Sequence, residues 1–231
     1  MNRPPLVAVV DYGAGNLVSI EQALVAVGAR VALVQDPSAM SGADALVVPG
    51  VGAAAPAMER LERQQLVDPI RRWIGDDRAY LGICLGLQLL FEGSDEDGAE
   101  TLGILPGRTV RLPDAPTLPH IGWNQVERRR DHALFDGIAD AADFYFVHSY
   151  AGAVTDDARE AVLAETTHGR PFVSAVAAGP LLGVQFHPER SGTDGLRLLS
   201  NFVGLVRSGE LAAGAGVSAG TAPTAAAPSR R

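Results

Sequence analysis

The stretch AYLGICLGLQLLF, residues 79–91, decides the fold expected for this chain. Its first half is a short apolar run typical of a buried strand, and its second half has the apolar spacing of a helix. Gly82 and Gly86 stand between the halves, and midway between them is Cys84, the only cysteine among 231 residues. Glycine permits the tight turn and the close backbone approach that a strand-to-helix corner requires. The stretch therefore predicts a sharp corner that carries a thiol.

Strand and helix patterns alternate along the whole chain. Apolar runs typical of parallel strands covered on both faces occur at 6–10, 30–35, 44–50 and 79–83. Helical spacing covers 17–28, 56–75, 85–91 and 195–207, and shorter β segments are expected at 109–112, 144–150, 161–166, 172–178 and 181–189. This alternation predicts an α/β fold, a mostly parallel doubly wound sheet with helices on both faces and a smaller antiparallel β portion.

One domain is expected over residues 4–208. Residues 209–231 are rich in Ala, Gly and Pro and have no apolar periodicity, so we expect a disordered tail there.

Composition excludes several function classes. The net charge of -8 argues against nucleic-acid binding, which requires basic residues to neutralise phosphates. No apolar stretch approaches the roughly 20 residues that span a bilayer, so we expect no membrane contact. A single cysteine cannot form an internal disulfide, which fits the reducing cytoplasm. We expect no metal, because no cluster has metal-ligand spacing, and no dinucleotide, because Val18 stands where a third glycine would follow Gly13 and Gly15.

Cys84 has two competing interpretations. Most lone cysteines are small buried hydrophobic residues. The pattern G-x-C-x-G instead resembles the elbow on which hydrolases hold a nucleophile, and a following helix N-terminus favours the thiolate. We therefore predict that Cys84 is a nucleophile and that the backbone amide of Leu85 is one donor to the oxyanion.

The nucleophile needs a base, and His187 fits best among the five histidines. It follows the predicted strand GVQF, at the edge where α/β sheets place their sites. Pro188 favours an extended conformation before it, so His187 and Glu189 should project to the same side. The carboxylate can then orient the imidazole. The other four are expected to be exposed loop residues (His132, His168) or packed, hydrogen-bonded core residues (His120, His148).

The loop VVPGVG, residues 47–52, follows another predicted strand. Gly50 and Gly52 flank Val51, so the 50–51 peptide can change orientation with little steric hindrance. A simple glycine-rich turn would explain the same pattern. The sharper prediction is that the amide of Val51 is the second oxyanion donor.

Taken together, GICLGLQ (82–88), PGVG (49–52) and QFHPE (185–189) resemble the class I, or triad, glutamine amidotransferases, over residues 5–207. The resemblance implies that glutamine is the substrate, that no cofactor is used, and that Cys84, His187 and Glu189 form a triad acting through a glutamyl thioester. The residues that it implies for holding glutamine are Gly50, Gly52, Gln88, Glu96, Ser149 and Tyr150.

Four further motifs narrow the resemblance: DYGAGNLVS (11–19), LPHIGWN (118–124), YFVHSY (145–150) and HPERSG (187–192). They are similar to the glutaminase subunits of imidazole glycerol phosphate synthase in histidine biosynthesis. This implies a (β/α)8-barrel cyclase partner that receives ammonia and makes imidazole glycerol phosphate and AICAR. It also implies a subunit that is nearly inactive alone. From the Gly-Val-Gly context of residues 50–52 we hypothesise that the 50–51 peptide is in the wrong orientation until the partner binds its ligand. The implied contact residues are Asn16, Trp123 and Arg190, the last where such subunits more often have lysine.

Other function classes remain open at this stage. A free-standing cysteine hydrolase of similar fold would typically have histidine directly after the cysteine, where this chain has Leu85. Glutaminases of other synthases usually carry histidine at the position of Leu87. A non-catalytic subunit would have no need to retain Cys84, His187 and Glu189. Release of glutamate from glutamine, with and without a barrel partner, distinguishes these alternatives.

Overall fold

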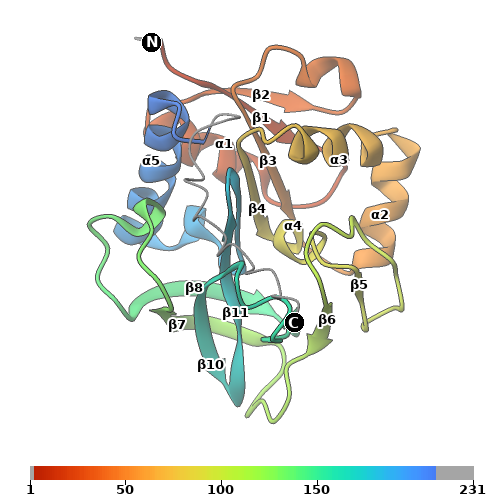
Figure 1. The fold of residues 1–231 in the computed structure, drawn as a ribbon, viewed down its shortest axis with the longest axis vertical. Coiled ribbons are helices and arrows are strands. Elements are labelled where there is room, and N and C mark those ends of the chain that lie inside the picture. The colour runs from red at the N-terminus through yellow and green to blue at the C-terminus, as the bar shows by residue number, and fades with distance from the viewer. Residues whose placement is uncertain (1–2, 212–231) are drawn as a thin grey trace, which may run out of the picture.

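The computed structural model describes residues 3–211, and within them most strands belong to one nine-stranded sheet (Figure 1). Its strands, in spatial order, are β2 (Arg30–Val34), β1 (Leu6–Val10), β3 (Ala45–Gly50), β4 (Tyr80–Cys84), β12 (Leu181–Val184), β11 (Arg170–Ala178), β10 (Val162–His168), β7 (His120–Arg128) and β8 (Ala142–His148). The first five run parallel, and the pairs from β12 to β8 are antiparallel. A second, three-stranded sheet contains β5 (Gly93–Ser94), β6 (Arg108–Arg111) and β9 (Tyr150–Gly152).

Helices cover both faces of the parallel half, as predicted. The described helices are α1 (Leu17–Ala26), α2 (Ala54–Arg63), α3 (Val67–Gly75), α4 (Leu85–Gln88) and α5 (Gly192–Ser208), with short 3-10 turns η1 (Pro37–Met40), η2 (Ala133–Phe135) and η3 (Pro188–Arg190). Alternate residues of β1 face opposite sides, because Val7 and Val9 pack with α1 and α5 while Ala8 and Val10 pack with α2 and α3. In Figure 1 the two helix pairs flank the strands on opposite sides.

Two predicted helices differ from the structure, and one strand was not predicted. The helical pattern over 56–75 is two helices, separated at Gln65, whose φ is 58°. The helix expected over 85–91 is only the four residues of α4. The nine residues of β7 had no predicted strand, because its residues are largely exposed and polar and only His120 and Val126 are buried.

The expected domain end at residue 208 coincides with the last residue of α5. The chain remains packed slightly further, since Leu211 is buried against the core that contains α5. The rest of the expected tail, residues 212–231, lies outside the described residues. Within the described part, no helix is both long and apolar enough to cross a membrane.

The topology brings three strand ends to one edge of the sheet. Gly50 at the end of β3 pairs with Cys84 at the end of β4, and Val184 at the end of β12 pairs with Ile83. The segments that follow these strands therefore meet at the carboxyl edge, where open α/β sheets place their binding sites. The segments that the sequence predicts to form the site follow β3, β4 and β12 and lie at that edge.

Candidate active site

Cys84 lies at a strained corner between β4 and α4. Its φ of 54° and ψ of -109° are rare for a residue with a side chain. A Cβ added to Gly82 would come within 2.6 Å of the carbonyl oxygen of Gly86. A Cβ on Gly86 would overlap the carbonyl oxygen of Val48 on β3. The two glycines are thus required by close backbone approach, which is the reason predicted for them.

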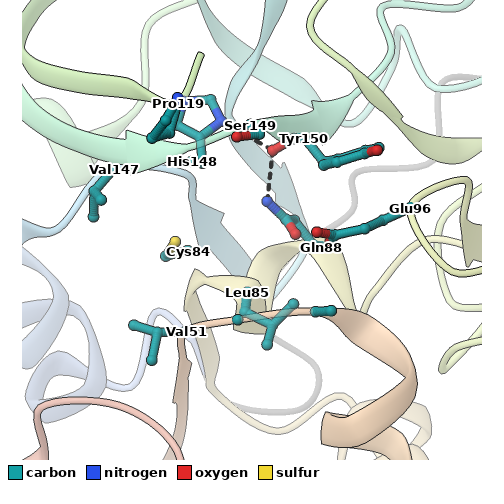
Figure 2. Close-up of a pocket in the computed structure, with 12 residues that line it drawn as sticks. Val51, Cys84, Leu85, Gln88, Glu96, Pro119, Val147, His148, Ser149 and Tyr150 are labelled. Atoms are coloured by element: carbon teal, nitrogen blue, oxygen red, sulfur yellow. Dashed lines mark hydrogen bonds between the residues drawn. The ribbon is translucent and has the colours of Figure 1, made fainter.

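A cavity of about 290 Å³ opens beside the sulfur (Figure 2). Its wall includes eight of the residues singled out from the sequence: Val51, Gly52, Cys84, Leu85, Gln88, Glu96, Ser149 and Tyr150. Ala53, Pro119, Val147 and His148 complete the lining. Cys84 is only 4% exposed, but that remaining surface faces the cavity. A small molecule in the cavity would therefore reach the thiol.

His187 and Glu189 are buried together behind the cavity wall. Nδ1 of His187 lies 2.8 Å from Oε1 of Glu189, whose side chain is 1% exposed. Burial alone lowers the pKa of His187, but the interactions with Cys84 and then with Glu189 outweigh it and raise the pKa to about 10. Nε2 of His187 has no hydrogen-bond partner of good geometry within residues 3–211. It is the ring atom free to exchange a proton with a group beside Cys84.

The amide of Gln88 is held in one orientation at the cavity wall. Its Nε2 donates to the carbonyl oxygen of Tyr150 at 2.7 Å and to Oε1 of Gln185 at 3.1 Å (Figure 2 draws the first bond). Both amide hydrogens are thereby used, so Oε1 of Gln88 is the atom left to accept a hydrogen bond from a ligand. Burial, and next the charge of Asp97, raises the pKa of Glu96 in the same wall.

The loop after β3 lies across the cavity from Ser149 and Tyr150 (Figure 2). Val51 is 46% exposed, and Gly52 has a φ of 93°, in the region that favours glycine. Gly50 does not line the cavity. A Cβ there would overlap the hydroxyl of buried Tyr12, so packing as well as flexibility requires glycine at this position.

The three residues expected at a partner interface, Asn16, Trp123 and Arg190, are all exposed. Asn16 caps α1, accepting a hydrogen bond from the Ser19 amide at 3.3 Å. Trp123 on β7 is 57% exposed, and its ring meets Tyr145 edge-on with centroids 6.1 Å apart. The guanidinium of Arg190 lies over the same Tyr145 ring, 4.1 Å from its centroid. Trp123 and Arg190 are thus joined through one tyrosine.

Two polar residues of the site were not predicted from the sequence to belong to it. His148 lines the cavity, and Gln185 donates to the Cys84 sulfur at 3.5 Å. The expectation that His120 and His148 are hydrogen-bonded core residues is confirmed, since His120 Nδ1 and His148 Nε2 are 3.1 Å apart. His168, expected in a solvated loop, instead stacks on His120 with ring centroids 4.0 Å apart. In the described ranges, no group of three or more His, Cys, Asp or Glu residues is arranged to hold a metal ion.

Similar proteins identify the family of this chain. The family model for glutamine amidotransferase class-I matches residues 8–205. The chain is a class-I glutamine amidotransferase. Two solved structures share the fold of this amidotransferase: PurLQS from Thermotoga maritima, with a TM-score of 0.68 and 17% identity over 87% of this chain and 98% of that one, and a glutamine amidotransferase with a TM-score of 0.67 and 22% identity over the same shares.

Relatives with higher sequence identity show to which family within the class-I glutamine amidotransferases this chain belongs. Imidazole glycerol phosphate synthase subunit HisH of Symbiobacterium thermophilum is 49% identical over 197 residues, covering 85% of this chain and 92% of the relative. The HisH subunit of Mycobacterium leprae is 46% identical over 204 residues, covering 87% and 98%. This amidotransferase therefore belongs to the HisH family.

Proposed function

We propose that this HisH-family protein is the glutaminase subunit of an imidazole glycerol phosphate synthase, and that it hydrolyses glutamine with Cys84, His187 and Glu189. The observation that carries the proposal is the position of Cys84. It stands on a strained elbow at the wall of a cavity, and its presence raises the pKa of a histidine that is itself hydrogen-bonded to a buried carboxylate.

In the proposed first step, the Cys84 sulfur, with its proton held on Nε2 of His187, attacks the side-chain amide carbon of glutamine. The developing oxyanion is held by the backbone amides of Leu85 and Val51, each contributing about 3 kcal/mol to transition-state stabilisation. The proton on His187 then passes to the departing nitrogen, so the C–N bond breaks and ammonia leaves. A glutamyl thioester remains on Cys84.

The second step releases glutamate. His187 removes a proton from water, the resulting hydroxide attacks the thioester carbon, and the C–S bond breaks to restore the thiolate. Glu189 orients the ring through Nδ1 and stabilises the imidazolium. The raised pKa of His187 supports this role, since it reflects a site that favours the charged ring.

The cavity wall suits the amino-acid part of glutamine. Oε1 of Gln88 and the carboxylate of Glu96 are acceptors for its α-ammonium group. Ser149 and Tyr150, on the facing wall, supply a hydroxyl group and backbone amides for its α-carboxylate. Gly52, and Gly50 behind it, leave room for the loop that carries Val51. Together these groups would hold the α-amino-acid end of glutamine and leave its side-chain amide for Cys84.

The proposal includes a (β/α)8-barrel cyclase that docks on the exposed face bearing Asn16, Trp123 and Arg190. Ammonia would pass directly to the cyclase, which protects it from protonation in bulk water. The names of the relatives, each a subunit of imidazole glycerol phosphate synthase, support such a partner. A single catalytic thiol must stay reduced to react. The cytoplasm is a reducing environment, so the thiol supports a cytoplasmic location.

The proposal is tested by measuring glutamate release and synthase turnover in the complex with the cyclase. Wild type should use either glutamine or ammonia, and Cys84→Ala should use only ammonia. Loss of both reactions in a folded Cys84→Ala complex, or glutamine use without Cys84, would refute the assignment. A wild-type subunit that releases glutamate at full rate without the cyclase would refute the proposed dependence on the partner.

A further inference from the structure

Gln185 is a buried polar residue directly behind the nucleophile. It follows β12, is fully buried, and its backbone amide donates to the carbonyl of Ser174 at 2.9 Å. Its neighbours Val184 and Phe186 are buried apolar residues. Burying an amide side chain among them costs free energy unless each of its polar atoms is used. The side chain is used, because Nε2 lies 3.5 Å from the sulfur of Cys84 and Oε1 accepts a hydrogen bond from Gln88.

The hydrogen-bond network determines which end of the Gln185 amide faces the sulfur. The carbonyl of Tyr150 can only accept, so the atom of Gln88 beside it must be the nitrogen. The second hydrogen of that nitrogen points to Gln185, which must therefore present its oxygen. Reversing Gln185 would place two NH2 groups against each other. The remaining NH2 group of Gln185 thus faces Cys84 and donates to it.

The hydrogen-bond network continues beyond Tyr150 through two histidines. Nδ1 of His148 donates to the Tyr150 carbonyl at 2.9 Å, so Nε2 of His148 accepts from Nδ1 of His120. Nε2 of His120 then accepts from the amide of Asn124 at 3.1 Å. Burial lowers the pKa of His120 to about 4 and that of His148 to about 3, so both rings are neutral at pH 7. Each hydrogen bond in the series that runs from Asn124 through the two histidines, the Tyr150 carbonyl and the two glutamines to the sulfur therefore has one donor and one acceptor.

Such a donor adds to the stabilisation that His187 gives the sulfur. Cys84 is almost excluded from water, which disfavours a negative charge on it. The helix that follows has four residues, so the amides of a long helix do not compensate. A hydrogen bond to the ionised form does compensate, because donors stabilise a charged acceptor more than a neutral one.

We propose that Gln185 is a catalytic residue that donates a hydrogen bond to the Cys84 sulfur, favouring the thiolate and holding it toward the cavity. This inference rests on the proposed role of Cys84 as nucleophile and adds a group to that site. Gln185 lines no part of the cavity, so it should act directly on the reactivity of the sulfur, and on glutamine binding only through the orientation of Gln88.

The inference is tested by alkylation with iodoacetamide. Cys84 is the only cysteine in the full chain, so the rate of thiol alkylation reports on this residue alone. The rate of alkylation is measured against pH for wild type, Gln185→Met, Gln185→Glu and the control Gln35→Met. Methionine keeps the bulk of glutamine without a donor, and glutamate keeps an acceptor for Gln88. Gln35 is an exposed glutamine that bonds to Asp11. The titratable groups near the sulfur, which every variant retains, are His187, Tyr12, His148 and Glu96.

Gln185→Met should slow alkylation at pH 7 about tenfold and move the rate profile to higher pH, the size expected for one charge-assisted bond. Gln185→Glu should lose more, because it adds a like charge, and Gln35→Met should match wild type. A folded Gln185→Met protein with the wild-type profile would overturn the inference. Loss of glutamine use in the complex with normal alkylation would instead bear on the proposed function.

Nuclear magnetic resonance of 15N-labelled wild type supplies a second test that needs no folded variant at residue 185. The side-chain amide resonances of Gln185 should shift when Cys84 ionises or is alkylated, because their acceptor changes. Resonances that stay in place through both changes would overturn the inference.

Discussion

Nδ1 of His187 and Oε1 of Glu189 are joined at 2.8 Å, and both side chains are buried. The two residues are separated by Pro188, which begins η3 and keeps His187 extended, with φ -102° and ψ 94°. A local sequence feature thus places a carboxylate behind the imidazole. The opposite ring atom, Nε2, is left for the chemistry at Cys84.

Glu189→Gln should reduce glutaminase kcat in the complex by roughly 100-fold to 10,000-fold, because the amide neither orients nor stabilises the imidazolium as a carboxylate does. The pKa of His187 should fall, since Glu189 is one of the interactions that raise it. Steady-state kinetics over a range of pH measure both effects. Asp194→Asn, at an acidic residue in the first turn of α5, is the control and should retain activity. Equal kinetics for wild type and Glu189→Gln would contradict the role of Glu189.

Gly86→Ala should destabilise the protein by about 3 kcal/mol or more, because the added methyl overlaps the Val48 carbonyl and α4 must move away from β3. Gly204→Ala is a matched control in α5, where an added Cβ has open space. That substitution should stabilise the helix by up to about 1 kcal/mol. Denaturant unfolding measures both. A Gly86→Ala protein as stable as wild type would show that the elbow does not need close backbone contact.

The neutral pair His120 and His148 should make the protein acid-sensitive. Burial holds the pKa of these residues at about 4 and 3, below the ordinary value of 6.5. From pH 6.5 down to about 4 the unfolded chain binds protons that the folded protein excludes, so stability falls as pH falls. Each histidine contributes up to roughly 1.4 kcal/mol per pH unit. His168, stacked on His120, adds to the repulsion on protonation.

The acid effect is measured as the free energy of unfolding between pH 7 and pH 4 for wild type and His120→Gln. The variant removes one titrating group, so its stability should fall less steeply with decreasing pH, by up to roughly 1.4 kcal/mol per pH unit. Parallel pH dependences would mean that the pKa of His120 is the same in the folded and the unfolded protein.

Trp123→Ala should weaken binding of the proposed cyclase at least tenfold, since exposed aromatic side chains held by a neighbour often dominate an interface. The stability of the isolated subunit should change little. Leu33→Ala is the control, because Leu33 is exposed on β2, at the opposite edge of the sheet from β7 and β8. Titration calorimetry gives both dissociation constants. Equal weakening by the two substitutions would place the partner elsewhere.

The sequence predicted those parts of the site that depend on local patterns. Cys84 between two glycines and His187 before a proline are such patterns, and each lies where expected in the fold. β7 was not predicted, because its largely polar sequence does not show the alternation of apolar residues that is typical of a covered strand. The contacts of Gln185 with Gln88 and Cys84 join residues 97 and 101 positions apart, and only the parallel pairing of β4 with β12 brings them together.

The nucleophilic attack of Cys84 on glutamine is tested most directly by trapping the acyl-enzyme. The complex is mixed with glutamine, quenched in acid within one turnover, digested, and the peptide containing Cys84 is examined by mass spectrometry. We predict a glutamyl adduct on Cys84 that forms and decays at rates consistent with kcat, and none in Cys84→Ala. Glutamate release at the normal rate with no adduct on Cys84, and retained by Cys84→Ala, would contradict the mechanism.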